Sequence, residues 1–105
     1  MESKVLIIQH AMSQLYGQIL NSSLPAEIKK KTLARVYEID INLMADLCER
    51  ATSKLTKGNV SYILCFVAVI DTKVIARIFN VEPASVHTSR YRLRGRFPLT
   101  TVMPF

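Results

Sequence analysis

Cysteine and histidine are scarce in this sequence. Its two cysteines, Cys48 and Cys65, have no second sulfur or histidine at the spacing of a metal ligand, so we expect both to be reduced thiols packed as small apolar groups. The two histidines, His10 and His87, fall on different predicted helices, and the pattern contains no carboxylate or thiol arrangement typical of catalysis. A glycine-rich phosphate loop is also missing. The sequence therefore predicts no enzyme activity, no metal site and no bound cofactor.

Long hydrophobic runs are missing as well. The apolar stretch from Val5 to Ile8 stops at Gln9 and is too short for the hydrophobic region of a signal peptide. No segment approaches the roughly 18 consecutive apolar residues that span a bilayer. We therefore expect a cytoplasmic protein with no membrane partner.

Acidic residues are few in the C-terminal half. The chain of 105 residues carries a net charge of +6, and half of its residues are apolar, which is a globular composition with room for one modest core. Residues 1–54 contain seven Lys/Arg and six Asp/Glu, whereas residues 55–105 contain seven and two. A basic C-terminal surface would attract a polyanion, either nucleic acid or an acidic membrane face, although a merely soluble basic protein has the same composition.

Hydrophobic periodicity predicts two N-terminal helices. The first is marked by apolar residues at spacings of three and four, namely Val5, Ile8, Met12, Leu15 and Ile19. The second begins at Pro25 and continues to about Lys54 through Leu33, Val36, Tyr37, Leu43, Met44 and Leu47. Asp40 falls on this second stripe, so we expect a break or a buried polar pairing there. The heptad-like spacing allows the two helices to pair with each other or with a second copy of the chain.

A third helix is predicted after Thr56, which can cap it, with Val60, Ile63, Leu64 and Val67 on its apolar face. Every residue from Tyr62 to Ile70 is apolar, so periodicity alone also allows a buried strand. We favour a helix because no second strand is available to satisfy the backbone of the first.

Two short helices and a tail complete the prediction. Asp71 caps a fourth helix that ends at Asn80, a residue that tolerates the left-handed conformation. Pro83 opens a fifth helix that runs to about Arg96 and presents Val86, Leu93 and Phe97 to the core until Pro98 stops it. Leu99 to Phe105 is expected to be extended, and Phe105 could dock on the domain.

Residues Leu55–Phe97 resemble the C-terminal helix-turn-helix domain of LuxR-type (GerE-like) bacterial regulators, in particular a Bacteroidetes-like subgroup. The matching residues are Leu55-Thr56, Lys73-Val74-Ile75-Ala76, Ile78-Phe79-Asn80-Val81, Pro83-Ala84-Ser85-Val86 and Ser89-Arg90-Tyr91-Arg92-Leu93-Arg94. The expected fold is therefore all-α, with an N-terminal helical hairpin for oligomerisation or regulation (1–54), a LuxR-like helix-turn-helix (55–97) and an extended tail (98–105). The resemblance leaves open whether the chain is a complete regulator or a fragment.

The resemblance assigns roles within the motif. Ala76 would let the two motif helices cross closely, and Val81 would fill the space between them. Asn59, Glu82 and Gly95 differ from the family pattern, which has a capping-box glutamate, a neutral cap and a basic residue at these places. Val69-Ile70 likewise replaces a turn of small residues.

The outward side of helix 83–96 would then enter the major groove of double-stranded DNA. We expect His87, Thr88 and Tyr91 to contact bases, with Ser85 on the flank of the same face. Phosphate contacts are expected from Lys73, Arg92, Arg94 and Arg96. Arg90 lies nearer the core stripe, where a structural salt bridge and a DNA contact are equally compatible with its position.

Two functions are compatible with these features. In the first, a homodimer of the chain binds double-stranded DNA in a sequence-specific manner and regulates transcription. In the second, the same fold is a protein-interaction module whose apolar surface around Tyr62–Ile70 binds a sensor or RNA polymerase. If the folded protein does not bind duplex DNA at low salt, the second function is favoured.

Overall fold

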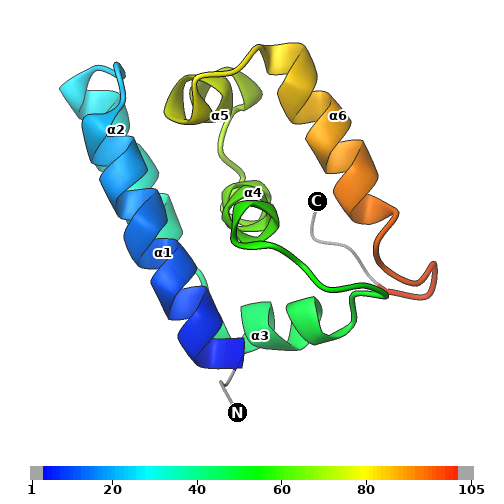
Figure 1. The fold of residues 1–105 in the computed structure, drawn as a ribbon. Coiled ribbons are helices and arrows are strands. Elements are labelled where there is room, and N and C mark those ends of the chain that lie inside the picture. Colours follow the sequence, from blue (N-terminus) through cyan, green and yellow to red (C-terminus); the bar gives the residue numbers. More distant parts are fainter. Residues whose placement is uncertain (1–3, 102–105) are drawn as a thin grey trace.

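Six α-helices form the described part of the chain, residues 4–101 of the computed structural model, and no strand occurs among these residues (Figure 1). The helices are α1 Lys4–Asn21, α2 Ala26–Tyr37, α3 Ile41–Glu49, α4 Lys57–Val67, α5 Thr72–Phe79 and α6 Pro83–Arg94. The predicted all-α fold is confirmed. Within this part of the chain, no helix combines the length and the apolar character needed to cross a lipid bilayer.

The first helix follows its predicted stripe. Ile8, Met12, Leu15 and Ile19 of α1 are all buried, and Ala11 joins them. α1 packs on α2, α3 and α4, and it therefore joins the other N-terminal helices to the centre of the fold.

The predicted second helix is divided in two at Asp40. α2 ends at Tyr37, and Asp40 then caps α3 because its carboxylate accepts hydrogen bonds from the backbone N–H groups of Asn42 (2.9 Å) and Leu43 (3.1 Å). Of the two alternatives at Asp40, the break is therefore correct. The N-terminal hairpin becomes three helices, and α3 ends at Glu49 rather than near Lys54.

The break also shifts the phase of the apolar stripe. Tyr37 and Leu43 were expected to lie on the buried face, but they are 75% and 66% exposed. α3 instead buries Met44, Ala45 and Cys48. Tyr37 is not left entirely to solvent, since its ring stacks on that of Tyr16 at a centroid distance of 5.4 Å.

The apolar segment Tyr62–Ile70 begins within the helix α4 and is not a strand. Its helix starts with a reciprocal capping box, in which the backbone N–H of Asn59 donates to Thr56 Oγ1 (3.1 Å) and the backbone N–H of Thr56 donates to Asn59 Oδ1 (3.0 Å). The asparagine therefore takes the part that a glutamate plays in the usual box. α4 lies at the centre of the molecule, where neighbours on several sides explain the uninterrupted run of apolar residues (Figure 1).

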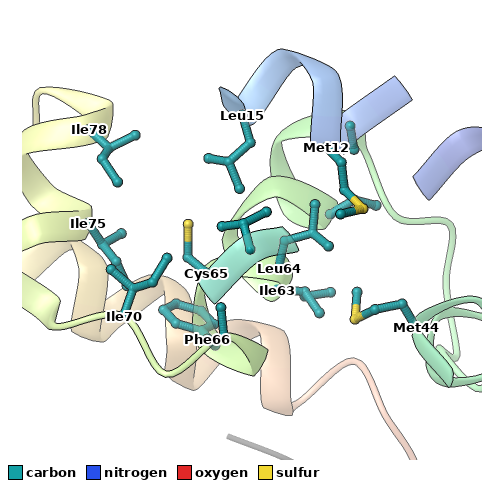
Figure 2. Close-up of a cluster of buried hydrophobic side chains, with 14 of the residues drawn as sticks. Met12, Leu15, Met44, Ile63, Leu64, Cys65, Phe66, Ile70, Ile75 and Ile78 are labelled. Atoms are coloured by element: carbon teal, nitrogen blue, oxygen red, sulfur yellow. The ribbon is translucent and has the colours of Figure 1, made fainter. Parts of the chain in front are cut away.

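The N-terminal helices and the expected DNA-binding region share one hydrophobic core. Figure 2 shows side chains that meet there from four helices: Met12 and Leu15, Met44, Ile63 to Phe66, and Ile75 with Ile78. The expected boundary after residue 54 falls in the loop between α3 and α4. The residues on its two sides are nevertheless packed together.

Val69 follows the C-cap residue of α4 and adopts the left-handed conformation, with φ of 57°. The backbone N–H of Ile70 donates to the carbonyl of Cys65 (3.1 Å), which is the long hydrogen bond of a Schellman motif. Glycine is the usual residue at this place, because a β-branched side chain is strained there. The Val69 side chain is 70% exposed, and its carbonyl accepts a hydrogen bond from Arg35 Nη1 (3.3 Å).

The C-terminal end of the fold differs from the prediction. α6 ends at Arg94 instead of Arg96, and Phe97 completes the core beyond it. The tail begins with a turn, in which the backbone N–H of Thr101 donates to the carbonyl of Pro98 (2.9 Å). The predicted docking of Phe105 lies outside the described residues.

Candidate nucleic-acid interface

Helices α5 and α6 and their short connection form a helix-turn-helix. Asp71 caps α5 by accepting a hydrogen bond from the backbone N–H of Lys73 (2.8 Å). Asn80 ends it in the left-handed conformation, with φ of 55° and ψ of 51°, and the backbone N–H of Val81 returns to the carbonyl of Ala76 (2.9 Å). Local signals in the sequence therefore fix both ends of α5.

The predicted burial of Ala76 is confirmed, whereas Val81 is more exposed than predicted. Ala76 is buried, as expected for a residue that permits close helix crossing. Val81 was expected to fill the space between the helices, but it is 38% exposed. The buried side chains Ile75, Ile78 and Val86 occupy the interior around the turn instead.

α6 is anchored by one narrow apolar face. Pro83 occupies its first turn, Glu82 precedes it without a side-chain capping bond, and Val86 and Leu93 are buried one above the other. The helix packs on both α5 and α4. The greater part of its surface is therefore left outside the core.

The predicted base-reading residues all lie on this exposed surface: Ser85, His87, Thr88 and Tyr91. Tyr91 is 81% exposed and projects its phenol ring into solvent. Thr88 is also exposed, but its Oγ1 donates to the carbonyl of Ala84 (3.1 Å). The methyl group and the oxygen lone pairs of Thr88 therefore remain for an outside partner, whereas its proton is used within the helix.

The predicted phosphate-binding residues are not all in equivalent places. Arg92 and Arg94 are exposed in the last turn of α6, about 160° apart on opposite edges of its outward face (α-helix spacing). Lys73 is exposed on α5, one residue after that helix begins. These three cations are therefore exposed on the two helices of the motif.

Arg96 lies beyond the end of α6, although it was predicted to lie within that helix. Its Nη1 donates to the carbonyl of Lys54 (3.1 Å), and its own carbonyl accepts hydrogen bonds from the backbone N–H and the hydroxyl of Thr52 (2.7 and 2.9 Å). Arg96 therefore ties the end of α6 to the loop between α3 and α4.

Arg90 contacts an aromatic ring rather than forming the salt bridge considered above. Its guanidinium carbon lies 4.6 Å from the ring centroid of Phe66 on α4, which is a cation–π geometry. The Nε atom beneath it is buried without a hydrogen-bond partner. Arg90 thus packs against the scaffold helix, on the inner side of α6.

Two further aromatic residues join the three helices around the motif. The Tyr62 ring on α4 stacks on Phe79 of α5 at 4.5 Å, and the Tyr62 side chain hydrogen-bonds to Ser89 of α6. Burial raises the pKa of Tyr62, and the Ser89 hydrogen bond opposes this rise. These contacts join separate helices, so no pattern within one segment predicts them. The four-residue spacing of Tyr62 and Phe66 indicates only that these two rings share a face of α4, where their centroids are 5.9 Å apart.

The apolar surface expected for the interaction-module alternative is largely buried. Ile63, Leu64, Cys65 and Phe66 are at most 2% exposed, and Ile70 is also in the core. Most of that surface is therefore not available to a partner, although Val69 is 70% exposed. An apolar groove of about 350 Å³ lies instead between α3 and the end of α4, lined by Asp40, Leu43, Met44, Asp46, Leu47, Arg50, Val67 and Thr101.

Comparisons with known protein families, with curated proteins and with solved structures find no match for this chain.

Proposed function

We propose that this protein is a helix-turn-helix DNA-binding protein whose helix α6 enters the major groove of double-stranded DNA. The observation that carries the proposal is the division of α6 into two sides. Val86 and Leu93 are buried on one side of the helix. The polar and cationic side chains on its other side are exposed. A helix of about 10–12 Å diameter fits a major groove of about 12 Å.

Within that class, we propose a LuxR-like transcription regulator that acts in the bacterial cytoplasm. The support is the agreement of the helix ends with the quoted motif residues: the Thr56 cap, the left-handed Asn80 and the proline that opens α6. The difference at Asn59 does not weaken the scaffold helix, because asparagine completes the capping box.

The side chains divide between base reading and phosphate binding. His87 and Tyr91 carry donors and acceptors near the middle of the outward face, and Thr88 offers a methyl group and lone pairs to a thymine methyl or an amino group. Arg92, Arg94 and Lys73 bind phosphates and set the register of α6 on the duplex. Arg90 and Arg96 hold the protein together instead.

We also propose that two copies bind DNA together through the groove between α3 and α4. Leu43 is 66% exposed at its edge, and the groove floor is apolar. Asp46 and Arg50 lie four residues apart on the same rim, so a two-fold arrangement places opposite charges across the contact. Dimeric binding predicts two half-sites separated by about 10 base pairs or a multiple of it.

Selection of bound sequences from a pool of random duplexes tests this proposal. A regulator enriches one motif, repeated with the spacing of two half-sites. Recovery of unselected sequences by a folded protein would contradict sequence-specific binding, and a single unrepeated motif would contradict the dimer.

A further inference from the structure

Hydrogen bonds connect the two ends of α2 with α5 and with the segment that precedes it. At the start of α2, Arg77 Nη2 of α5 donates to the carbonyl of Ser23 (2.9 Å) and to its hydroxyl (3.3 Å). At the other end, Arg35 Nη1 donates to the carbonyl of Val69, shortly before α5 begins. The start of α2 is therefore held near the second half of α5, and the end of α2 is held near the residues that precede α5. In Figure 1, α5 lies between α2 and α6.

Cations gather along this pair of helices. Lys30, Lys31 and Arg35 are exposed on α2, and Lys73 and Arg77 are exposed four residues apart on α5. A hollow of about 190 Å³ between the helices is lined by Lys31 and Arg35 from one side and by Asp71 and Val74 from the other.

Acidic residues on these helices do not balance the cations. Glu27 lies in the first turn of α2, and the Asp71 carboxylate is engaged in capping α5. Four of the eight acidic residues of the chain instead lie between positions 38 and 49. Asp46 and Glu49 are on α3, whereas Glu38 and Asp40 line a hollow with Arg35 and Val69 at the end of α2. The five exposed cations of α2 and α5 therefore outnumber the acidic residues beside them, which are Glu27, Glu38 and Asp71.

We propose that Lys30 and Lys31 of α2 bind the phosphate backbone of the same duplex that α6 reads, so that the N-terminal helices form part of the DNA interface. This inference rests on the proposed function. In a helix-turn-helix the first helix, here α5, crosses the backbone. Lys31 faces the start of α5 across the hollow, and Lys73 is the second residue of α5, so a phosphate backbone that passes Lys73 can also reach the ammonium groups of α2.

Salt-dependent titration of single-lysine variants tests this extension of the interface. The probe is a duplex that carries the sequence enriched from the random pool, with about 10 flanking base pairs on each side (one helical turn). The variants are Lys31→Ala, the double Lys30→Ala/Lys31→Ala, and Lys4→Ala as the matched control. Lys4 is an exposed lysine and the first residue of α1, whose start lies beside α3 and away from α5 (Figure 1). All three substitutions are on helix surfaces, and circular dichroism checks that each variant is folded.

The inference predicts that the salt slope of log K falls by about 0.9 for Lys31→Ala and by about 1.8 for the double variant, because each lost phosphate contact releases fewer counterions. Lys4→Ala keeps the slope of the unmodified protein. On a duplex without the flanking base pairs, the α2 variants become indistinguishable from it.

Two other results have distinct meanings. Equal slopes for Lys4→Ala, Lys31→Ala and the unmodified protein would overturn the inference and leave the proposed function intact. Failure of the unmodified protein to bind any duplex would overturn the proposed function itself, and the inference with it.

Discussion

Arg90 lies over the ring of Phe66, with 4.6 Å between the guanidinium carbon and the ring centroid. This contact distinguishes the packed side chain of Arg90 from the exposed side chains of Tyr91 and Arg92 that follow it. Arg90 joins the recognition helix to the scaffold helix α4, whereas Arg92 is exposed two residues later. The same amino acid therefore has a stability role at one position and a proposed DNA-binding role at the other.

The first prediction compares these two arginines. Arg90→Ala should lower the free energy of unfolding by about 1 kcal/mol, since it removes a cation–π contact and the packing of the side-chain stem. Arg92→Ala should change it by less than about 0.5 kcal/mol, as is usual for exposed sites. Urea denaturation measures both. Equal stability of the two variants would contradict the structural role of Arg90.

The second prediction concerns the left-handed residue at the end of α4. Val69→Gly should raise the free energy of unfolding by about 1 kcal/mol, because glycine adopts positive φ without the steric cost that valine incurs. The Val69 side chain is 70% exposed, so little burial is lost. Val81→Gly is the control, since Val81 is also an exposed turn valine but has no positive φ. Thermal unfolding should show a higher Tm for the first variant and a lower Tm for the second; a lower Tm for Val69→Gly would contradict the account.

The third prediction concerns the buried thiol of Cys65. Burial raises its pKa to about 12, so only ~10⁻⁴ of it is thiolate at pH 8 in the folded state. Its alkylation by iodoacetamide should therefore follow unfolding. Because the folded-state pKa is raised, the protonated thiol stabilises the fold below the unfolded pKa of about 8.5, and this contribution is lost as the pH rises toward 12. The Cys65→Ala variant should show a weaker decline of stability in that range. Rapid alkylation of Cys65 in the native protein at pH 8 would contradict burial of this thiol.

The fourth prediction concerns the proposed dimer. Leu43→Glu places a carboxylate at the apolar groove beside Asp40 and Asp46, which should weaken self-association at least tenfold through lost burial and like-charge repulsion. Leu20→Glu is the matched control, because Leu20 is 57% exposed on α1 and does not line the groove. Sedimentation equilibrium gives the association constant of each variant. A dimer unaffected by Leu43→Glu would place the contact elsewhere.

The predictions that succeeded from sequence rest on local chemistry. The caps at Asp71 and Thr56 and the left-handed Asn80 depend on hydrogen bonds within a few residues, and each is formed in the structure. The break at Asp40 was one of two alternatives, since a polar residue on an apolar stripe either caps a helix or is buried with a partner.

The features that sequence reasoning missed depend on residues distant in the chain. Arg96 hydrogen-bonds to Lys54, and Arg77 hydrogen-bonds to Ser23, across 42 and 54 positions. The exposure of Val81 depends on how α5 and α6 settle on α4. No periodicity within one segment contains these relationships, so the place of α2 beside the motif could not be derived before the fold was known.

The central claim is that the outward face of α6 binds double-stranded DNA, and a salt-dependent titration of a duplex carrying the selected sequence tests it most directly. The account predicts binding that weakens steeply with salt, a uniform loss across sequences for Arg92→Ala/Arg94→Ala, and a changed sequence preference for Thr88→Ala and Tyr91→Ala. Arg96→Ala should leave the salt slope unchanged, since its guanidinium bonds to the Lys54 carbonyl. Unchanged affinity and preference in all the α6 variants, or no binding by the folded protein at low salt, would contradict the account.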